Sequence, residues 1–178
     1  MYTPKTPYTE IALQSLLCYL THRSLKNLTF TNIPPDLYQQ KKGCFVSLHQ
    51  LNGDLRGCIG TIDPREKNLV MEISRNAVSA AMDDSRFRPL KFEEMEEIEI
   101  SVDVLSKPDP LSDLDDLDPQ IFGVIVSDGS FRKALLLPCL EGIDTIEKQL
   151  SIVKHKAGLS EIPDDELMFQ RFTSTRYR

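Results

Sequence analysis

The sequence predicts an α+β protein with mostly antiparallel strands, and two observations carry this prediction. First, the dipeptides Asn52-Gly53 and Asp128-Gly129 each separate two apolar-rich runs, which is typical of β-hairpins. Second, each hairpin pattern is followed by a helical pattern and then by another strand pattern. Residues 44–105 and 121–173 therefore share one order of elements, and we expect a duplicated hairpin-helix-strand unit.

The first half begins with a helix. Residues 9–23 place apolar side chains at three- and four-residue steps, and residues 69–82 repeat that spacing. Between these helices, residues 44–51 and 55–62 are the strands of the first hairpin. Residues 98–104 alternate apolar and polar side chains, which predicts a strand with one buried face and one wet face.

The second half repeats this order. Residues 121–127 and 131–137 are the predicted strands of the second hairpin. A helical stripe follows over residues 146–157, and residues 167–173 form a last strand. The acidic stretch 109–118 is interpreted as a solvated linker, so that one domain, residues 1–178, contains two halves of about 1–107 and 119–178.

Composition excludes several classes of protein. The chain of 178 residues is 40% hydrophobic and 27% charged, which is ordinary for a globular protein and excludes global disorder. A net charge of −6 disfavours nucleic-acid binding. Because no apolar run approaches membrane-spanning length and no secretory signal opens the chain, we expect a cytoplasmic protein without a membrane segment. No metal site is predicted and no cofactor is indicated, since the cysteines and histidines lack ligand spacing; the four thiols, Cys18, Cys44, Cys58 and Cys139, are expected to be reduced.

The first hairpin gathers reactive side chains. With Asn52 and Gly53 as a two-residue loop, Ser47 faces Cys58 and His49 faces Arg56. Side chains alternate along a strand, so these four share one face, while the apolar side chains of Val46, Leu48 and Ile59 line the other. A three-residue loop would shift the register by one and mix the two classes.

Two readings of this face stay open. A guanidinium beside a thiol favours the thiolate, so Cys58 is a candidate nucleophile or ligand, with Arg56 as its anion partner and His49 as a candidate base. Gly57 and Gly60, which flank the thiol, mark a bulge or a close approach by a ligand or another chain. Alternatively, Cys58 is an inert buried thiol in a structural or docking hairpin.

The run Leu55-Arg56-Gly57-Cys58-Ile59-Gly60-Thr61 resembles the hallmark motif of the AMMECR family, whose prokaryotic members are named as protein A of the AmmeMemoRadiSam system. The resemblance extends over nearly the whole chain, through Phe45-Val46-Ser47-Leu48, Asn76-Ala77, Asp84-Ser85-Arg86-Phe87, Leu137-Pro138 and Lys156-Ala157-Gly158-Leu159. It implies a duplicated strand-and-helix unit around one barrel-like sheet.

The resemblance also implies a site and partners. A binding site at the motif would be lined by Ser47, Gly57, Gly60 and Thr61, with Asp84 and Arg86 beside it in a cleft. For Asp84 and Arg86, a capping and ion-pair cluster is the plainer interpretation. An enzyme acting on a small-molecule or peptidic substrate and a non-catalytic interaction module both fit. The naming of the prokaryotic members implies a Memo-like protein and a radical-SAM protein as partners. This chain has no radical-SAM cluster motif of its own, so that chemistry would belong to a partner.

Overall fold

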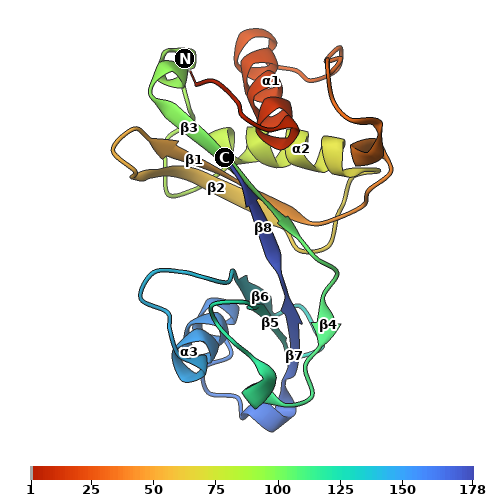
Figure 1. The fold of residues 1–178 in the computed structure, drawn as a ribbon. Helices are drawn as coiled ribbons and strands as arrows, with labels where there is room; N and C mark the ends of the chain where they lie inside the picture. The colour runs from red at the N-terminus through yellow and green to blue at the C-terminus, as the bar shows by residue number, and fades with distance from the viewer. Residues whose placement is uncertain (1) are drawn as a thin grey trace. The chain divides into compact units, whose positions relative to one another are not determined.

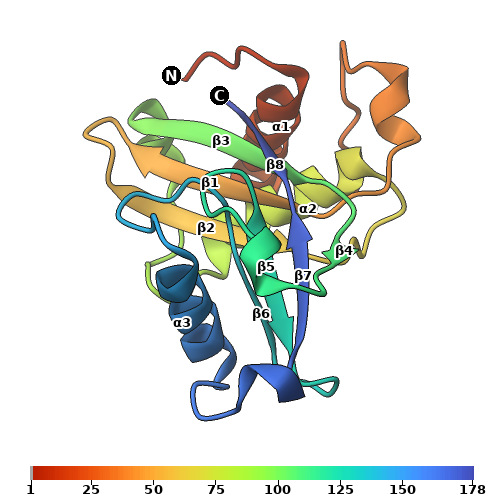
Figure 2. The same ribbon diagram turned by 60° about the horizontal axis from the view of Figure 1, so that its bottom comes forward.

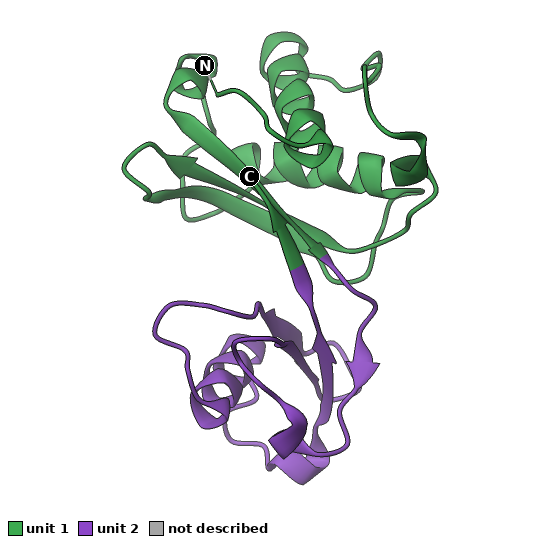
Figure 3. Ribbon diagram, viewed as in Figure 1, with its two compact units in different colours: residues 1–104, 175–178 green, residues 105–174 purple. Residues whose placement is uncertain are grey.

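The structure is a computed structural model that describes residues 2–178. It divides into two compact units (Figure 3). Unit 1 comprises the chain up to Val104 together with Thr175–Arg178, and unit 2 comprises Leu105–Ser174. The mixture of helices with antiparallel strands confirms the predicted α+β class. In the described part of the chain the strands form two open four-stranded sheets, and neither sheet is a closed barrel.

Unit 1 packs two long helices on one face of a sheet (Figure 1). The sheet, called sheet A, has the order β2-β1-β3-β8, with β1 at Cys44–Gln50, β2 at Leu55–Thr61, β3 at Ile98–Leu105 and β8 at Ser174–Tyr177. Three of these strands, β2, β1 and β3, lie side by side in Figure 2. The helices are α1 (Pro7–His22) and α2 (Leu69–Met82), with short 3-10 turns η1 (Pro35–Tyr38) and η2 (Phe92–Glu96).

Local chemistry sets the ends of these helices. The N-cap of α1 is Thr6, which forms a capping box with Thr9, and Pro7 occupies the first turn, where its missing N–H costs nothing. The side chain of Asn68 accepts a hydrogen bond from the Met71 N–H at the start of α2. The helices then bury their apolar stripes against Val46, Leu48, Ile100 and Val102 of the sheet.

Unit 2 repeats the order of elements on a smaller scale. Its sheet, called sheet B, has the order β4-β7-β5-β6, with β4 at Asp109–Pro110, β5 at Gly123–Ser127, β6 at Lys133–Leu136 and β7 at Met168–Phe172. The helix α3 (Ile146–Ala157) packs on it, beside the 3-10 turns η3 (Leu114–Asp116) and η4 (Asp164–Glu166). In both sheets the first hairpin strand lies between its hairpin partner and the strand that follows the helix.

The acidic stretch predicted as a linker belongs to unit 2. Its strand β4 pairs with β7. Leu117 is buried in the unit 2 core, and Leu111 and Leu114 pack against that core. The leucines of this stretch therefore serve as apolar anchors between exposed acidic residues.

Candidate functional site

The β1–β2 hairpin places Ser47 opposite Cys58, as the sequence predicts. The pairs Val46–Ile59, Ser47–Cys58 and Leu48–Gly57 all follow the expected register. Val46 and Leu48 are fully buried on the helix side of sheet A. Ser47 and Cys58 therefore lie on the opposite face, which we call the polar face.

The turn end of the hairpin differs from the prediction. Gln50 and Asp54 close a three-residue loop, because the Gln50 N–H donates to the Asp54 carbonyl and the Gly53 N–H donates to the Gln50 carbonyl. His49 pairs with Leu55, so the predicted pairing of His49 with Arg56 is wrong. Arg56 is the extra residue of a β-bulge, which cancels the shift of the longer loop and restores the register before Cys58.

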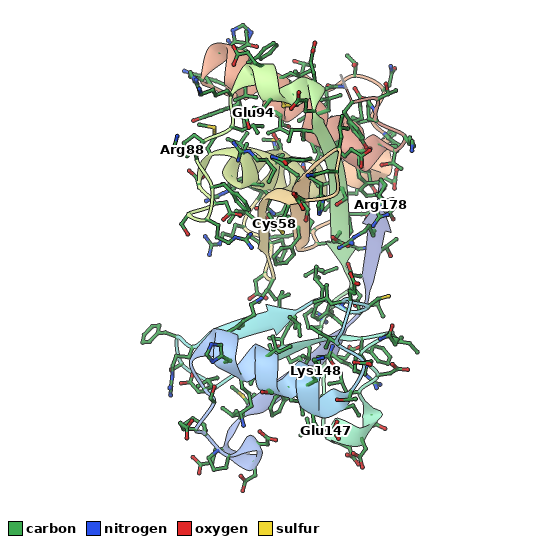
Figure 4. All side chains as sticks on the ribbon, turned by 90° about the vertical axis from the view of Figure 1, so that its left-hand side faces the viewer. Cys58, Arg88, Glu94, Glu147, Lys148 and Arg178 are labelled. Atoms are coloured by element: carbon green, nitrogen blue, oxygen red, sulfur yellow. The ribbon has the colours of Figure 1, made fainter. Side chains whose placement is uncertain are left out.

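The bulge gives Arg56 a different partner from the one predicted. Its guanidinium binds the carboxylate of Glu94 in η2 through two contacts, Nε–Oε1 at 2.9 Å and Nη2–Oε2 at 3.2 Å. Figure 4 labels Glu94 and Cys58, which occupy separate elements of unit 1. The guanidinium carbon also lies 5.9 Å from the centre of the Phe87 ring. Arg56 is thus a buried partner of Glu94 rather than the anion partner of the thiol.

Three small polar side chains form a row across the polar face. The Ser47 hydroxyl donates to Cys58 Sγ over 3.2 Å. On its other side Ser47 pairs with Ser101 of β3, so both serines project from the same face. Ser101 is only 4% exposed, and its hydroxyl has no hydrogen-bond partner among residues 2–178. We call Cys58, Ser47 and Ser101 the polar row.

The surroundings of Cys58 favour the protonated thiol. Burial raises the pKa of Cys58 most strongly, and the carboxylates of Asp103 and Asp84 raise it further. The Ser47 hydrogen bond and the positive charge of Arg86 oppose this and lower the pKa, but the net direction is upward. Arg56 is engaged by Glu94 and is not among the groups that act on this thiol, and burial has the largest effect on the pKa of Cys58.

Asp84 and Arg86 lie beside the motif. Since β2 is an edge strand, its outward N–H groups lack a strand partner, and Asp84 Oδ2 accepts the N–H of Cys58 over 2.9 Å. Arg86 binds the same carboxylate through Nη2 at 2.7 Å and Nε at 3.0 Å. These contacts, the Arg86 hydrogen bond above all, lower the pKa of Asp84 to about 2. Asp84 thereby fixes the backbone that carries the thiol.

The motif glycines have packing partners inside the chain. A Cβ at Gly57 would lie 2.2 Å from the Ala80 carbonyl oxygen of α2, on the helix side of the sheet. A Cβ at Gly60 would lie 2.3 Å from Cγ of Phe45. Close approach of α2 and of the Phe45 ring explains both glycines.

Thr61 takes part in a buried network that the motif alone did not indicate. Its hydroxyl donates to Glu72 Oε1 over 2.5 Å and accepts from Asn76 Nδ2. The other Glu72 oxygen accepts the N–H groups of Arg65 and Glu66, which fixes the loop after β2. Glu72 is fully buried. Its place within the apolar stripe of α2 was the signal that could have revealed it.

His49 lies on the polar face between β2 and β3, two residues along β1 from Ser47 and opposite Glu99. Its pKa is lowered by burial first, then by the positive charges of Arg176 and Arg178, while Glu99 and Asp103 oppose the shift. The imidazole is therefore neutral at neutral pH, and its strand neighbours are Leu55 and Glu99 rather than Cys58.

Sequence reasoning missed the β3 contribution to this face. Ser101 and Asp103 were expected on a wet face, yet both are buried, and Asp103 binds the Arg176 guanidinium of β8 at 2.9 Å. The alternation of β3 indicated which side chains share a face, but not whether that face is exposed. Among residues 2–178 no three histidine, cysteine, aspartate or glutamate side chains gather as a metal site would require, and no helix is long and apolar enough to cross a membrane.

Fold and motif together define a two-unit α+β protein with a thiol-bearing hairpin. The AMMECR1 family model matches residues 9–177, and the chain belongs to this family. A Thermotoga maritima protein is 43% identical over 172 residues, which is 97% of each chain. A Clostridium acetobutylicum protein is 40% identical over 98% of this chain, which spans only 36% of that longer relative. The crystal structure of an uncharacterized Pyrococcus horikoshii protein has a TM-score of 0.85 at 29% identity, over 98% of this chain and 93% of the other.

Proposed function

We propose that unit 1 is a ligand-binding module whose site is the polar face of sheet A, and that Cys58 contacts the bound molecule as a protonated thiol. The observation that carries this proposal is the buried, unpartnered hydroxyl of Ser101 at one end of the polar row. An orphaned buried hydroxyl costs free energy, and a ligand that supplies a hydrogen-bond partner recovers it.

The raised pKa of the Cys58 thiol favours ligand binding over nucleophilic catalysis by the free protein. Arg56, the expected anion partner of Cys58, binds Glu94, and His49, the candidate base, pairs with Leu55 on β2 and lies two residues along β1 from Ser47. A protonated thiol is a weak nucleophile, and it can contact a ligand as a weak hydrogen-bond donor or acceptor. The motif glycines need no ligand to explain them, because α2 and Phe45 occupy the space that side chains would fill.

Cysteine-dependent catalysis is the second candidate, and one observation favours it. Both the Ser47 hydrogen bond and the Arg86 charge lower the pKa of Cys58. A ligand that brought a further positive charge beside the thiol would add to these two effects and favour the thiolate. In this alternative the polar face binds the substrate first, and Cys58 becomes reactive only in the complex.

Native mass spectrometry tests the proposal. The purified chain is incubated with a metabolite extract and compared with Ser47→Phe, which places a large side chain in the middle of the polar row. We expect a small-molecule adduct on the wild-type chain that the variant loses. Lys148→Gln, an exposed change on α3, is the control and should keep the adduct. An adduct that survives in Ser47→Phe, or no adduct on the wild type, would contradict the proposal.

The resemblance to AmmeMemoRadiSam proteins supplies a proposed context. Memo-like and radical-SAM partners would act on the molecule that this module binds. Copurification of a tagged chain from a host that encodes both partners tests this association.

A further inference from the structure

A groove on unit 1 adjoins the free end of the polar row. It has a volume of about 430 Å³ and is lined by eight residues: Tyr2, Lys5, His49, Gly53, Glu99, Ile100, Ser101 and Arg178. Figure 4 labels Arg178 at the end of β8. The strand register places the side chains of His49, Glu99 and Ser101 on the polar face, so this part of the groove lining shares a face with Cys58.

We propose that this groove binds the carboxylate group of a small organic acid, with Ser101, Lys5 and Arg178 as hydrogen-bond and charge partners. The inference rests on the proposed function and specifies its ligand.

The hydrogen-bond donors that line the groove suit a carboxylate. The Ser101 hydroxyl is buried and unpartnered, and Ser101 is one of the residues that line the groove. Lys5 and Arg178 line the same groove as cations. Hydrogen bonds from cationic groups and hydroxyls to a carboxylate are shorter and stronger than neutral pairs.

The charges that line the groove also suit a carboxylate. Among the side chains that line the groove, Lys5 and Arg178 are positive and Glu99 is negative, so the cationic side chains outnumber the anionic one. Arg176, which binds Asp103 in a bidentate pair, does not line the groove.

The lowered pKa of His49 agrees with the presence of cations near the groove. The groups that act on it are Arg176 and Arg178 from β8 and Glu99 and Asp103 from β3, and the two cations lower its pKa. An anion seated beside Arg178 would oppose the cations and move that pKa upward. His49 is therefore a spectroscopic reporter for the groove.

The distance from Ser101 to Cys58 sets the length of an acid that could reach both. Ser101 and Cys58 flank Ser47 on neighbouring strands, so two strand spacings separate them, about 10 Å. An acid with its carboxylate at Ser101 and a chain of about that length would reach the thiol. Ser47 and Cys58 do not line the groove itself, so Cys58 would contact only a tail that extends beyond it.

Titration with sodium hexanoate, followed by NMR of the His49 imidazole and the Ser101 amide, tests the inference. We expect saturable shifts at both residues and a higher His49 pKa in the saturated protein. Lys5→Gln and Ser101→Ala should each weaken binding about tenfold. Lys41→Gln, an exposed change away from the groove, should bind like the wild type.

Three results would overturn the inference: no shifts with hexanoate, equal binding by 1-hexanol, or tighter binding of inorganic phosphate. If Ser101→Ala proved unfolded, Lys5→Gln would decide alone, because Lys5 is exposed. A native-state adduct that depends on Ser47 but not on Lys5 would refute the carboxylate groove while leaving the proposed binding function intact.

Discussion

Replacing Ser101 by alanine should stabilise the protein. The side chain is buried, 4% exposed, and its hydroxyl has no hydrogen-bond partner in the described residues. An unsatisfied buried polar group costs about 1–3 kcal/mol, and the alanine variant removes that cost while leaving a gap of only one oxygen atom. We therefore expect the free energy of unfolding to rise by about 1 kcal/mol, with Tm higher by about 2–4 °C for a chain of this size.

Urea denaturation and thermal unfolding of the free protein measure this change. The matched control is Ser47→Ala, which removes the donor of the 3.2 Å bond to Cys58 Sγ and should cost about 0.5–1.5 kcal/mol. Ser47 and Ser101 are neighbours on one face. A gain of stability in Ser101→Ala together with a loss in Ser47→Ala would therefore isolate the effect of the hydrogen-bond partner that Ser101 lacks. If Ser101→Ala lowered stability as Ser47→Ala does, the hydroxyl would be satisfied in the free protein and the argument for a ligand partner would fail.

Three further changes test the framework of the site. Asp84→Asn should cost about 2 kcal/mol at pH 7, because the folded-state pKa of about 2 lies below the ordinary carboxyl value. The stabilisation by Asp84 is complete above about pH 4 and is lost as pH falls toward 2. A difference in unfolding free energy between wild type and variant that stayed constant across pH in urea would contradict this prediction. Gly57→Ala should destabilise by about 3 kcal/mol, because its Cβ would meet the α2 backbone. Gly53→Ala, where the Cβ has open space and only the backbone φ of +90° is strained, should cost about 1–2 kcal/mol, so equal midpoints in urea would refute the close approach at Gly57. Thr61→Val should cost about 1–3 kcal/mol by removing the hydroxyl that donates to buried Glu72, and unchanged unfolding would show that this hydrogen bond contributes nothing.

The sequence predicted the faces of the hairpin because alternation leaves few choices. Val46 and Leu48 must share the buried side, which places Ser47 on the other, and the structure agrees. The same reasoning could not place Arg56. The three-residue loop shifts the strand register by one residue, and the bulge at Arg56 shifts it back. Hydrophobic alternation cannot distinguish that combination from a two-residue loop without a bulge.

Family membership followed from the motif and is confirmed, but the chemistry of the site did not follow from spacing. The ionisation of Cys58 depends on burial and on Arg86, which lies 28 positions further along the chain. The orphaned hydroxyl of Ser101 is equally invisible to pattern analysis, because a polar residue on an alternating strand is normally solvated. Burial of a polar strand face is a property of the folded chain, and only coordinates reveal it.

The most direct test of the account is the rate of Cys58 alkylation by iodoacetamide as a function of pH, followed by peptide mass spectrometry. We predict a thiol pKa above the ordinary value of about 8.5, no change in Arg56→Gln, and a still higher pKa in Arg86→Gln. A Cys58 that reacts fastest of the four cysteines at neutral pH, with a pKa below about 8.5 that rises in Arg56→Gln, would contradict the protonated-thiol binding site and restore the nucleophile.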